Sequence, residues 1–590
     1  MPKSPSISYK ELQSLLPAGA LHFFEPEKTY PLQEVPAHTL LRAERFDLGV
    51  KAHFAQSILQ GKENGYAASL YAAHLAVWNG FYENTPSKDS LADFTRSFVA
   101  LATSPSQKQI LPTDANLSLI DGAHRASLAI IRNQDVTVAR AEKTSDNYNY
   151  EAFASYANVL QPELAEILLD QMAFHFSRFQ PDARCVCIFP STEDAKGSEI
   201  EKLISSCCSI YYRKQYTPSA ASFRQLLLHL YYLDERRWIG TFANDFAGLK
   251  EKLSLCFKPK QKLTLYFVTG LSNDRSLELK EQIRSLFELQ KHSCHIGNSH
   301  AELMMLAEMS LHSADAIFDK IQIPSSFTQF ASCFEKLQSF VNNSGIAKED
   351  FCIAGSTILA MLGIRDCRDI DLIFSPRVQN IQLPEGLGNH ASEQSWYPAS
   401  FEDITSDPRY YFYFFGFKVA RPWVIFKFKK ARAEDPKDLN DVRSLLQVFP
   451  DLDSWEEPYF SKEALERAAE RALKRILREK DEAISYHRKN LSASHLSEIQ
   501  RAAELQQQLL SKEEEITELR TRAAALLDDK KVLQKDVTKL QNKSEQREKE
   551  LDLCEHALRL KTNLITSSSQ EIAQPSAPRI PRFFSSKNPT

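Results

Sequence analysis

Apolar residues recur along this chain with different spacings, and each spacing predicts a different kind of element. Near the N-terminus they return every three or four residues, which is typical of amphipathic helices, over Phe46 to Ile58 and Gly65 to Trp78. Farther on, the short apolar runs at 185–190 and 262–270 are rich in strand-forming residues, and each precedes a helical or polar segment. This alternation predicts a mixed α/β, or α+β, multidomain protein.

The next part of the chain opens with a helical pattern over Phe330 to Val341 and continues with three apolar runs. We expect these runs, FCIAGS at 351–356, DIDLIF at 369–374 and WVIFKFK at 423–429, to be strands. Shifts in composition then divide the chain into three globular domains, a helical connector, a coiled coil and a disordered tail, with predicted bounds 1–150, 151–325, 326–450, 451–494, 495–562 and 563–590.

The coiled coil is predicted from a seven-residue repeat. With Leu505 placed at a d position, 12 of the 16 a and d positions through Leu558 are apolar, and the positions between them are mostly Glu, Lys, Gln and Arg. A lone solvated helix is the alternative, but it does not need such a seam. Because an apolar seam needs a partner, we expect a homo-oligomer. The tail beyond it is rich in Ser and Pro, which is typical of disorder.

Composition excludes several classes of protein. Lys and Arg number 72 against 76 Asp and Glu, so there is no overall positive charge to attract nucleic acid, and nucleic acid is not expected as a partner. Only 17 residues are Gly, and neither common glycine-rich nucleotide motif occurs. The 10 cysteines form no C-x-x-C pair, which favours reduced thiols in a cytoplasmic protein. We find no secretory signal pattern and no apolar stretch long enough to span a membrane.

The first candidate site lies where a predicted strand ends at Gly355 and Ser356. The following strand carries Asp369 and Asp371, and alternation along a strand puts both carboxylates on one face. Two adjacent carboxylates repel unless a cation lies between them, and phosphoryl chemistry supplies Mg²⁺ for that purpose. Gly355 allows a phosphate close to the backbone, and the Ser356 hydroxyl can donate to it.

These residues resemble the nucleotidyltransferase superfamily of the DNA polymerase β type, whose motif is hG[GS] followed by [DE]h[DE]h. The resemblance covers about 100 residues, through KFKKARAEDPKDLNDVRSLL, and implies Asp369 and Asp371 as catalytic metal ligands and Lys430 and Lys437 as phosphate contacts. The superfamily's third carboxylate is missing from FYFFGFKVARPWVIFKFK, although Asp403 or Asp407 could replace it. A degenerate domain that keeps the fold without the chemistry is the alternative.

A second candidate site is the sequence LSLIDGAHRASLAII at 117–131. It delivers Asp121 and Gly122 to the start of a helix that carries His124 and Arg125, and Arg125 is suited to binding a phosphate. The stretch resembles the D-G-x-H-R signature of the ParB/sulfiredoxin superfamily, which implies a nucleotide-phosphate site with catalytic roles for Asp121 and His124. Upstream basic residues could extend this site or could form a solvated helix face: Arg42, Arg45 and Lys51.

A third candidate lies in the segment 278–311, where His295 precedes a polar loop and an apolar-faced helix. Together with two upstream strand-and-helix pairs, the segment is similar to nucleoside diphosphate kinase, which implies a ferredoxin-like domain with His295 as phosphoacceptor and Arg284 as a phosphate contact. Asn298 stands where that family has an acid, and His300 and His295 could also be ordinary loop histidines.

The three resemblances together are found in multidomain proteins encoded with bacterial surface-polysaccharide enzymes. They imply a Mg²⁺-dependent phosphotransferase or nucleotidyltransferase that uses a nucleoside triphosphate, with ATP the expected one, and acts on a sugar, glycan or nucleotide-sugar. They further imply a cytoplasmic enzyme, peripheral at the inner face of the membrane, with a membrane-associated glycan synthase as partner. Two alternatives stay open: a coiled-coil scaffold with degenerate nucleotide-binding domains, and a nucleic-acid-associated protein.

Overall fold

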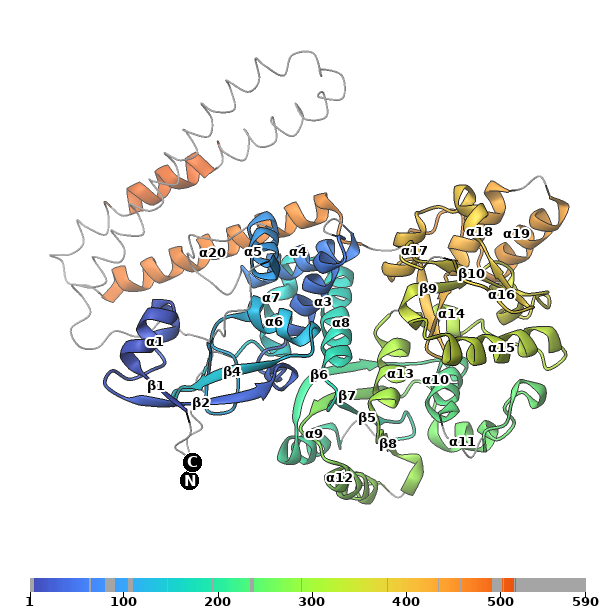
Figure 1. Ribbon diagram of the computed structural model, residues 1–590, viewed down its shortest axis with the longest axis horizontal. Helices are drawn as coiled ribbons and strands as arrows, with labels where there is room; N and C mark the ends of the chain where they lie inside the picture. Colours follow the sequence, from blue (N-terminus) through green and yellow to red (C-terminus); the bar gives the residue numbers. More distant parts are fainter. Residues whose placement is uncertain are drawn as a thin grey trace, which may run out of the picture. The chain divides into compact units, whose positions relative to one another are not determined.

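Three separate β-sheets organise residues 1–472, the first of two units into which the computed structural model divides the chain (Figure 1). This arrangement confirms the prediction of a mixed α/β fold. The second unit comprises residues 473–590. The structure describes residues 5–62, 65–79, 91–103, 110–145, 147–192, 196–233, 238–287, 289–312, 314–378, 380–432, 435–456, 459–490, 501, 503–513 and 515.

The N-terminal sheet has the order β1-β2-β4-β3, in which β3 and β4 are parallel and the other neighbours are antiparallel. Its strands are β1 (Ser6–Ser8), β2 (Thr29–Pro36), β3 (Ile110–Thr113) and β4 (Asp135–Arg140). The helices of this part are α1 (Tyr9–Leu15), α2 (Ala18–Leu21), α3 (Leu48–Leu59), α4 (Tyr66–Trp78), α5 (Leu91–Thr103), α6 (Ala123–Ile131), α7 (Tyr150–Tyr156) and α8 (Pro162–Phe179). Helices α3 and α4 are the two that the amphipathic pattern predicts.

Helix α3 crosses α8 at very close range because Gly49 has no side chain. A Cβ atom at Gly49 would lie 2.5 Å from the backbone nitrogen of Phe176 on α8. Only glycine lets the two backbones approach so closely. This contact holds the N-terminal helices against the helix that leads into the middle sheet.

The middle sheet has the order β6-β7-β5-β8, and every neighbouring pair is antiparallel. This is the strand order of a ferredoxin-like unit, with helices inserted between β6 and β7. The strands are β5 (Arg184–Ile188), β6 (Ser209–Tyr216), β7 (Leu263–Thr269) and β8 (Cys294–Ile296). The helices are α9 (Gly197–Cys207), α10 (Ala220–Tyr232), α11 (Leu249–Cys256), α12 (Asn273–Ser285), α13 (His300–Ser310) and α14 (Asp315–Phe318).

The third sheet has the order β11-β10-β9-β13-β12. Its strands are β9 (Phe351–Ala354), β10 (Ile370–Phe374), β11 (Leu387–Asn389), β12 (Tyr411–Phe414) and β13 (Phe417–Ala420). The helices are α15 (Thr328–Ser344), α16 (Thr357–Met361), α17 (Phe401–Ser406), α18 (Pro422–Ala431) and α19 (Pro436–Val448). The prediction of a strand at WVIFKFK is wrong, because these residues form α18 with Pro422 in its first turn. The alternation of Phe and Lys at the end of the run is typical of a strand, but in the helix Lys429 is buried by ion pairs with Asp438 and Asp441.

The C-terminal predictions fall mostly on residues outside the described part. Helix α20 (Lys462–Asn490) occupies much of the predicted connector. Within the predicted coiled coil, the described residues 501, 503–513 and 515 are helical. The rest of the coiled coil and the tail 563–590 lie outside the described residues.

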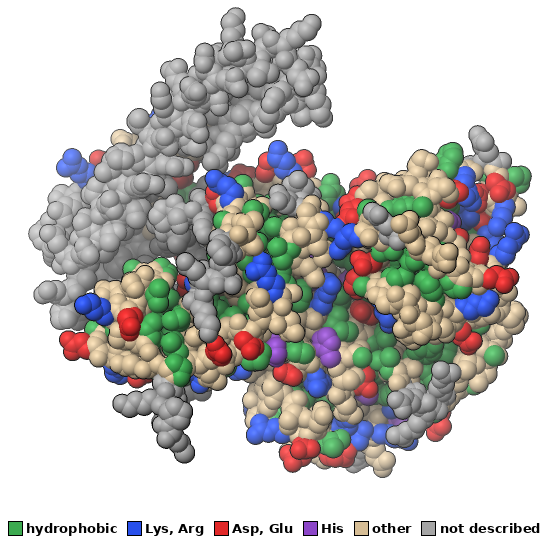
Figure 2. All heavy atoms as spheres, viewed as in Figure 1, with side chains coloured by type: hydrophobic (Ala, Val, Ile, Leu, Met, Phe, Trp, Pro, Cys, Tyr) green, Lys and Arg blue, Asp and Glu red, His purple; other side chains and the backbone are tan. Residues whose placement is uncertain are grey.

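The surface and the thiols also bear on the sequence predictions. On the face drawn in Figure 2, basic and acidic side chains are interspersed rather than segregated. The nine cysteines of the described part are all free, and most of them are buried. In the described ranges, no helix combines the length and apolar character that crossing a membrane requires.

Candidate functional site

Asp371 lies near the start of β10, in the interior of the third sheet. It faces Ala354 on the antiparallel strand β9 and Gly388 on the parallel strand β11. Asp369 immediately precedes β10, and its pKa is raised by burial and then by the negative charge of Asp371. The negative charge of Asp371 therefore acts on Asp369, which precedes the strand and is not part of it.

Two glycines make room for the Asp371 carboxylate. Gly355 has a φ of +62°, a left-handed conformation, and a Cβ atom there would overlap Oδ2 of Asp371. A Cβ atom at Gly388 would lie 2.6 Å from Oδ1 of the same carboxylate. Side chains at these two positions would displace the acid, so the two glycines form a cradle that leaves room for the carboxylate.

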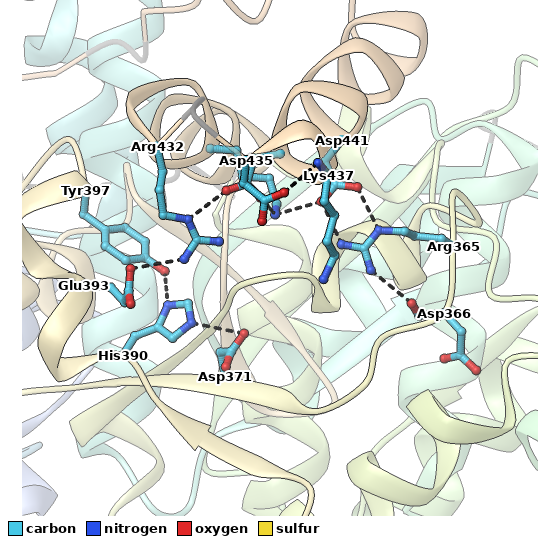
Figure 3. A network of polar contacts seen from close by, with 12 residues as sticks. Arg365, Asp366, Asp371, His390, Glu393, Tyr397, Arg432, Asp435, Lys437 and Asp441 are labelled. Atoms are coloured by element: carbon cyan, nitrogen blue, oxygen red, sulfur yellow. Dashed lines mark hydrogen bonds and ion pairs between the residues drawn. The ribbon is translucent and has the colours of Figure 1, made fainter.

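A histidine contacts one oxygen of Asp371, and a tyrosine in turn holds the histidine ring (Figure 3). Nε2 of His390 lies 3.1 Å from Oδ2 of Asp371, and Nδ1 lies 2.6 Å from the Tyr397 hydroxyl. Because a carboxylate only accepts hydrogen bonds, the ring donates to Asp371 from Nε2, while Nδ1 bonds the tyrosine hydroxyl. The Tyr397 ring stacks on Phe428, with ring centroids 4.2 Å apart. Sequence reasoning missed both His390 and Tyr397.

Helix α19 carries the K-D-x-x-D sequence, and its two acids, Asp438 and Asp441, take part in a buried network of ion pairs (Figure 3). Asp441 makes two bonds of 2.7 Å with Arg365, and Asp438 accepts one of 2.7 Å from Arg432. Lys429, only 3% exposed, lies 2.8 Å from both acids. These bonds hold α19 against α18 and against the segment that precedes β10. The two acids therefore stabilise the structure that surrounds the site.

The other predicted phosphate contacts lie apart from this network. Lys430 is exposed and makes an ion pair of 2.6 Å with Asp453. Lys437 is exposed at the start of α19, and its positive charge is among the groups that partly offset the raised pKa of Asp369. Of these two lysines, Lys437 is therefore the one whose charge affects the pKa of Asp369.

The suggested third carboxylates both serve other contacts. Asp403 accepts the Ser400 hydroxyl at the first turn of α17, at 2.6 Å. Asp407 is held by the Arg409 guanidinium. Among the residues that the structure describes, no group of three His, Cys, Asp or Glu side chains is arranged to hold a metal ion. Mg²⁺ commonly takes only one or two carboxylates, together with water and substrate phosphates, so the pair Asp369 and Asp371 fits the donor set that it uses.

At the N-terminal candidate site, Gly122 caps α6 with a φ of +87°. Nη2 of Arg125 lies 3.3 Å from Oδ2 of Asp121 one turn away, which brings these two predicted residues together. His124 instead packs among α4 and α5: its ring nitrogens lie 3.2 Å from the hydroxyls of Tyr71 and Ser97. The corner therefore contains Asp121, Gly122 and Arg125, while His124 belongs to the packing beside it.

A buried ion triad lies beside this corner. Asp47 is fully buried and contacts Arg45 at 2.8 Å and Lys51 at 2.5 Å. Nη1 of Arg45 also donates to the Leu119 carbonyl, two residues before Asp121. Arg45 and Lys51 are each 3% exposed, so they are not a solvated basic face, and only Arg42 retains partial exposure.

In the middle sheet, His295 lies on β8 opposite Cys187 of β5. Its Nε2 is 3.6 Å from Oε2 of Glu302, the third residue of α13. Burial lowers the pKa of His295, and Glu302 opposes that effect. Arg284 makes its own ion pair with Glu281, at 2.6 Å. His295 thus lies beside an acid, at a buried position that disfavours its charged form.

Comparisons with known proteins identify no relative of this chain. No protein-family model matches the chain, and no curated protein or solved structure matches it either.

The glycine cradle yields a test with a matched control. Gly355→Ala should displace Asp371 and lower Mg²⁺-dependent nucleotide binding by at least about tenfold, because the new methyl group overlaps the carboxylate. Gly345→Ala is the control, since Gly345 also has a positive φ, +70°, but no heavy atom lies within 4 Å of its Cβ position. Both variants carry a backbone strain of about 1 kcal/mol, measurable by denaturant unfolding. Equal nucleotide binding by the two would contradict the cradle.

Proposed function

We propose that the third sheet carries a Mg²⁺-dependent nucleotidyl- or phosphoryl-transfer centre built on Asp369 and Asp371. The observation that supports this most is the Asp371 carboxylate in its cradle of Gly355 and Gly388, with a second carboxylate beside it. Placing an acid against bare backbone next to another acid costs free energy unless a cation uses the pair.

Each residue of the centre has a defined part in this proposal. Asp369 and Asp371 would bind Mg²⁺, and the ion supplies neutralisation of phosphate charge during transfer. Gly355 and Ser356 would hold the triphosphate. His390, backed by Tyr397, is a positioning residue that fixes the orientation of the Asp371 carboxylate. Lys437 would add positive charge near the phosphates.

The wider proposal follows the sequence resemblances. The donor would be a nucleoside triphosphate, with ATP the first to test, and the acceptor a sugar, glycan or nucleotide-sugar of bacterial surface polysaccharide. Asp121, Gly122 and Arg125 would form a second phosphate site, and His295 with Arg284 a third. The coiled coil would make the enzyme a homo-oligomer at the cytoplasmic face of the membrane, beside a glycan synthase.

The test is a turnover assay of the full chain with each nucleoside triphosphate, with Mg²⁺ or with EDTA. Release of pyrophosphate would identify nucleotidyl transfer, and release of a nucleoside diphosphate would identify phosphoryl transfer. We expect one of these products in the presence of Mg²⁺ and neither with EDTA. If neither appears with any sugar or nucleotide-sugar acceptor, the transferase proposal fails.

A second candidate function is a scaffold whose domains bind nucleotides without turning them over. It is favoured by His390, which already contacts the Asp371 oxygen that a metal ion would need, 3.1 Å away. Equilibrium binding of nucleotide to the full chain, without any product, would support the scaffold over the enzyme.

A further inference from the structure

A cavity of about 840 Å³ lies between the N-terminal helices and the third sheet. Helices α3 and α8 form one side, and α17, β12 and β13, with the residues just before β9, form the other. Its volume is in the range of sites that bind small molecules. It lies at the beginning of β9, whereas Gly355 and Asp371 lie at the end, roughly 16 Å along the strand direction. The cavity is therefore separate from the proposed transfer centre.

The residues of α8 that line the cavity are mostly polar, although the helix is otherwise deeply buried. Gln171, Phe174, His175 and Arg178 follow the spacing that places residues on one face of a helix, and all four line the cavity. A helix that served only the core would carry apolar side chains on that face. The polar side chains indicate that something other than packing selects them.

The wall from α3 repeats the pattern. His53, Gln56 and Ser57 line the cavity from one face of that helix. The His53 ring stacks on the His175 ring, with centroids 3.6 Å apart and an interplanar angle of 11°. The close crossing of α3 and α8 thus brings two imidazoles together at the cavity wall.

Several buried polar atoms on these walls have no partner in the described part of the chain. Both ring nitrogens of His53 and of His175 lack a hydrogen bond, and so does Oε1 of Gln171. His175 is only 4% exposed. Buried polar groups in native proteins are almost always hydrogen-bonded, so this cluster points to a ligand that supplies the bonds.

Three of the four cations that line the cavity make ion pairs with acids of the cavity wall, and Arg178 does not. Lys418 pairs with Glu349 at 2.6 Å, and Lys62 pairs with Glu402. Arg178 makes no hydrogen bond or ion pair with any residue that the structure describes, although its charge helps to lower the pKa of Glu349 on the same cavity wall. A planar guanidinium without a partner at a cavity wall is suited to carboxylate or phosphate oxygens.

We propose that this cavity binds a small molecule with an anionic oxygen group, a carboxylate or a phosphate, held by Arg178 and hydrogen-bonded by His53 and His175. Burial lowers the pKa of His53 to about 3, with help from the positive charge of Arg178, and burial likewise lowers that of His175. Both imidazoles are thus neutral near pH 7, and each offers one N–H donor to the ligand oxygens.

The proposal is tested by titrating the full chain with inorganic phosphate, citrate and glucose, without nucleotide or Mg²⁺, and measuring thermal unfolding and binding heat. Phosphate or citrate should raise the melting temperature, and glucose should not, because it lacks the charge. Arg178→Gln should weaken binding of the effective anion by at least about tenfold. Arg275→Gln, on α12 away from the cavity, is the matched control and should bind as the wild type does.

A structural role for Arg178 is distinguished by stability without ligand. Because Arg178 makes no hydrogen bond or ion pair and Glu349 keeps its ion pair with Lys418, Arg178→Gln should melt close to the temperature of the wild type. Gln56→Trp, which fills the cavity from α3, should abolish the anion response in a chain that keeps Arg178. If neither phosphate nor citrate binds, or if Arg178→Gln binds them with unchanged affinity, the proposal is overturned, whatever the outcome of the transferase assay.

Discussion

Replacing Asp369 and Asp371 together by asparagine should reduce Mg²⁺-dependent nucleotide turnover by at least about 100-fold. Asparagine keeps the shape of each side chain, so Gly355 and Gly388 still accommodate position 371 and its oxygen can still accept from His390. What is lost is the pair of negative charges that would bind the cation. Removing two carboxylates that repel each other should leave the melting temperature within about 2 °C of the wild type.

The single variants and a control sharpen this result. Asp371→Asn should cost more than Asp369→Asn, because Asp371 is the acid held in the glycine cradle and oriented by His390. Asp453→Asn removes an exposed acid that pairs with Lys430, and it should leave turnover unchanged. Unchanged turnover in the double variant would exclude the third sheet as the active centre. A large drop in melting temperature would show instead that the acids serve the fold.

Asp47→Asn should lower the free energy of unfolding by about 3–5 kcal/mol. Asp47 is fully buried between Arg45 and Lys51. Burial alone would raise its pKa, but the two adjacent cations outweigh burial and bring the pKa far below the ordinary carboxyl range. Asparagine would leave two buried cations without a counter-charge. Denaturant unfolding with the signal of residues 1–472 measures the loss.

Acid pH gives an independent check on the same triad. Because the pKa of Asp47 is lowered in the folded state, its stabilising contribution is complete above the ordinary carboxyl range and is lost as the pH falls below it. The difference in stability between the wild type and Asp47→Asn should therefore be smaller at acid pH than at pH 7. Glu142→Gln, which breaks an exposed pair with Lys28, is the control and should change stability by about 1 kcal/mol or less. A comparable small change for Asp47→Asn would contradict a buried, charged triad.

The local pattern of apolar and polar residues was sufficient to predict many helices and strands of this protein. The amphipathic spacing predicts α3 and α4, and the apolar runs predict β5, β7, β9 and β10 in the places where the structure has them. The strands are buried at nearly every residue, so it was their short length and their strand-forming residues, rather than an alternation, that identified them. The run WVIFKFK has the same length and composition, but it forms part of the buried helix α18, so these two criteria alone gave a wrong prediction there.

Long-range contacts explain what local pattern missed at the candidate site. His390 and Tyr397 lie 19 and 26 residues beyond Asp371 in the sequence, and only the parallel pairing of β10 with β11 brings His390 to the acid. Arg45 and Lys51 looked like candidates for a solvated basic face, because a sequence does not show that Asp47 is buried between them. A signal existed in Gly388, a glycine in a strand, which often marks a close approach.

By itself the sequence determined the mixed α/β class, the neighbouring pair Asp369 and Asp371, and the turn at Gly355, because each depends on residues only a few positions apart. Only the tertiary structure decided what surrounds them. The cavity walls at His53, His175 and Lys418 come from three distant parts of the chain, and folding alone brings them together. The spacing of residues in the sequence does not predict such contacts, because burial and charge pairing depend on the whole packed unit and not on any one segment.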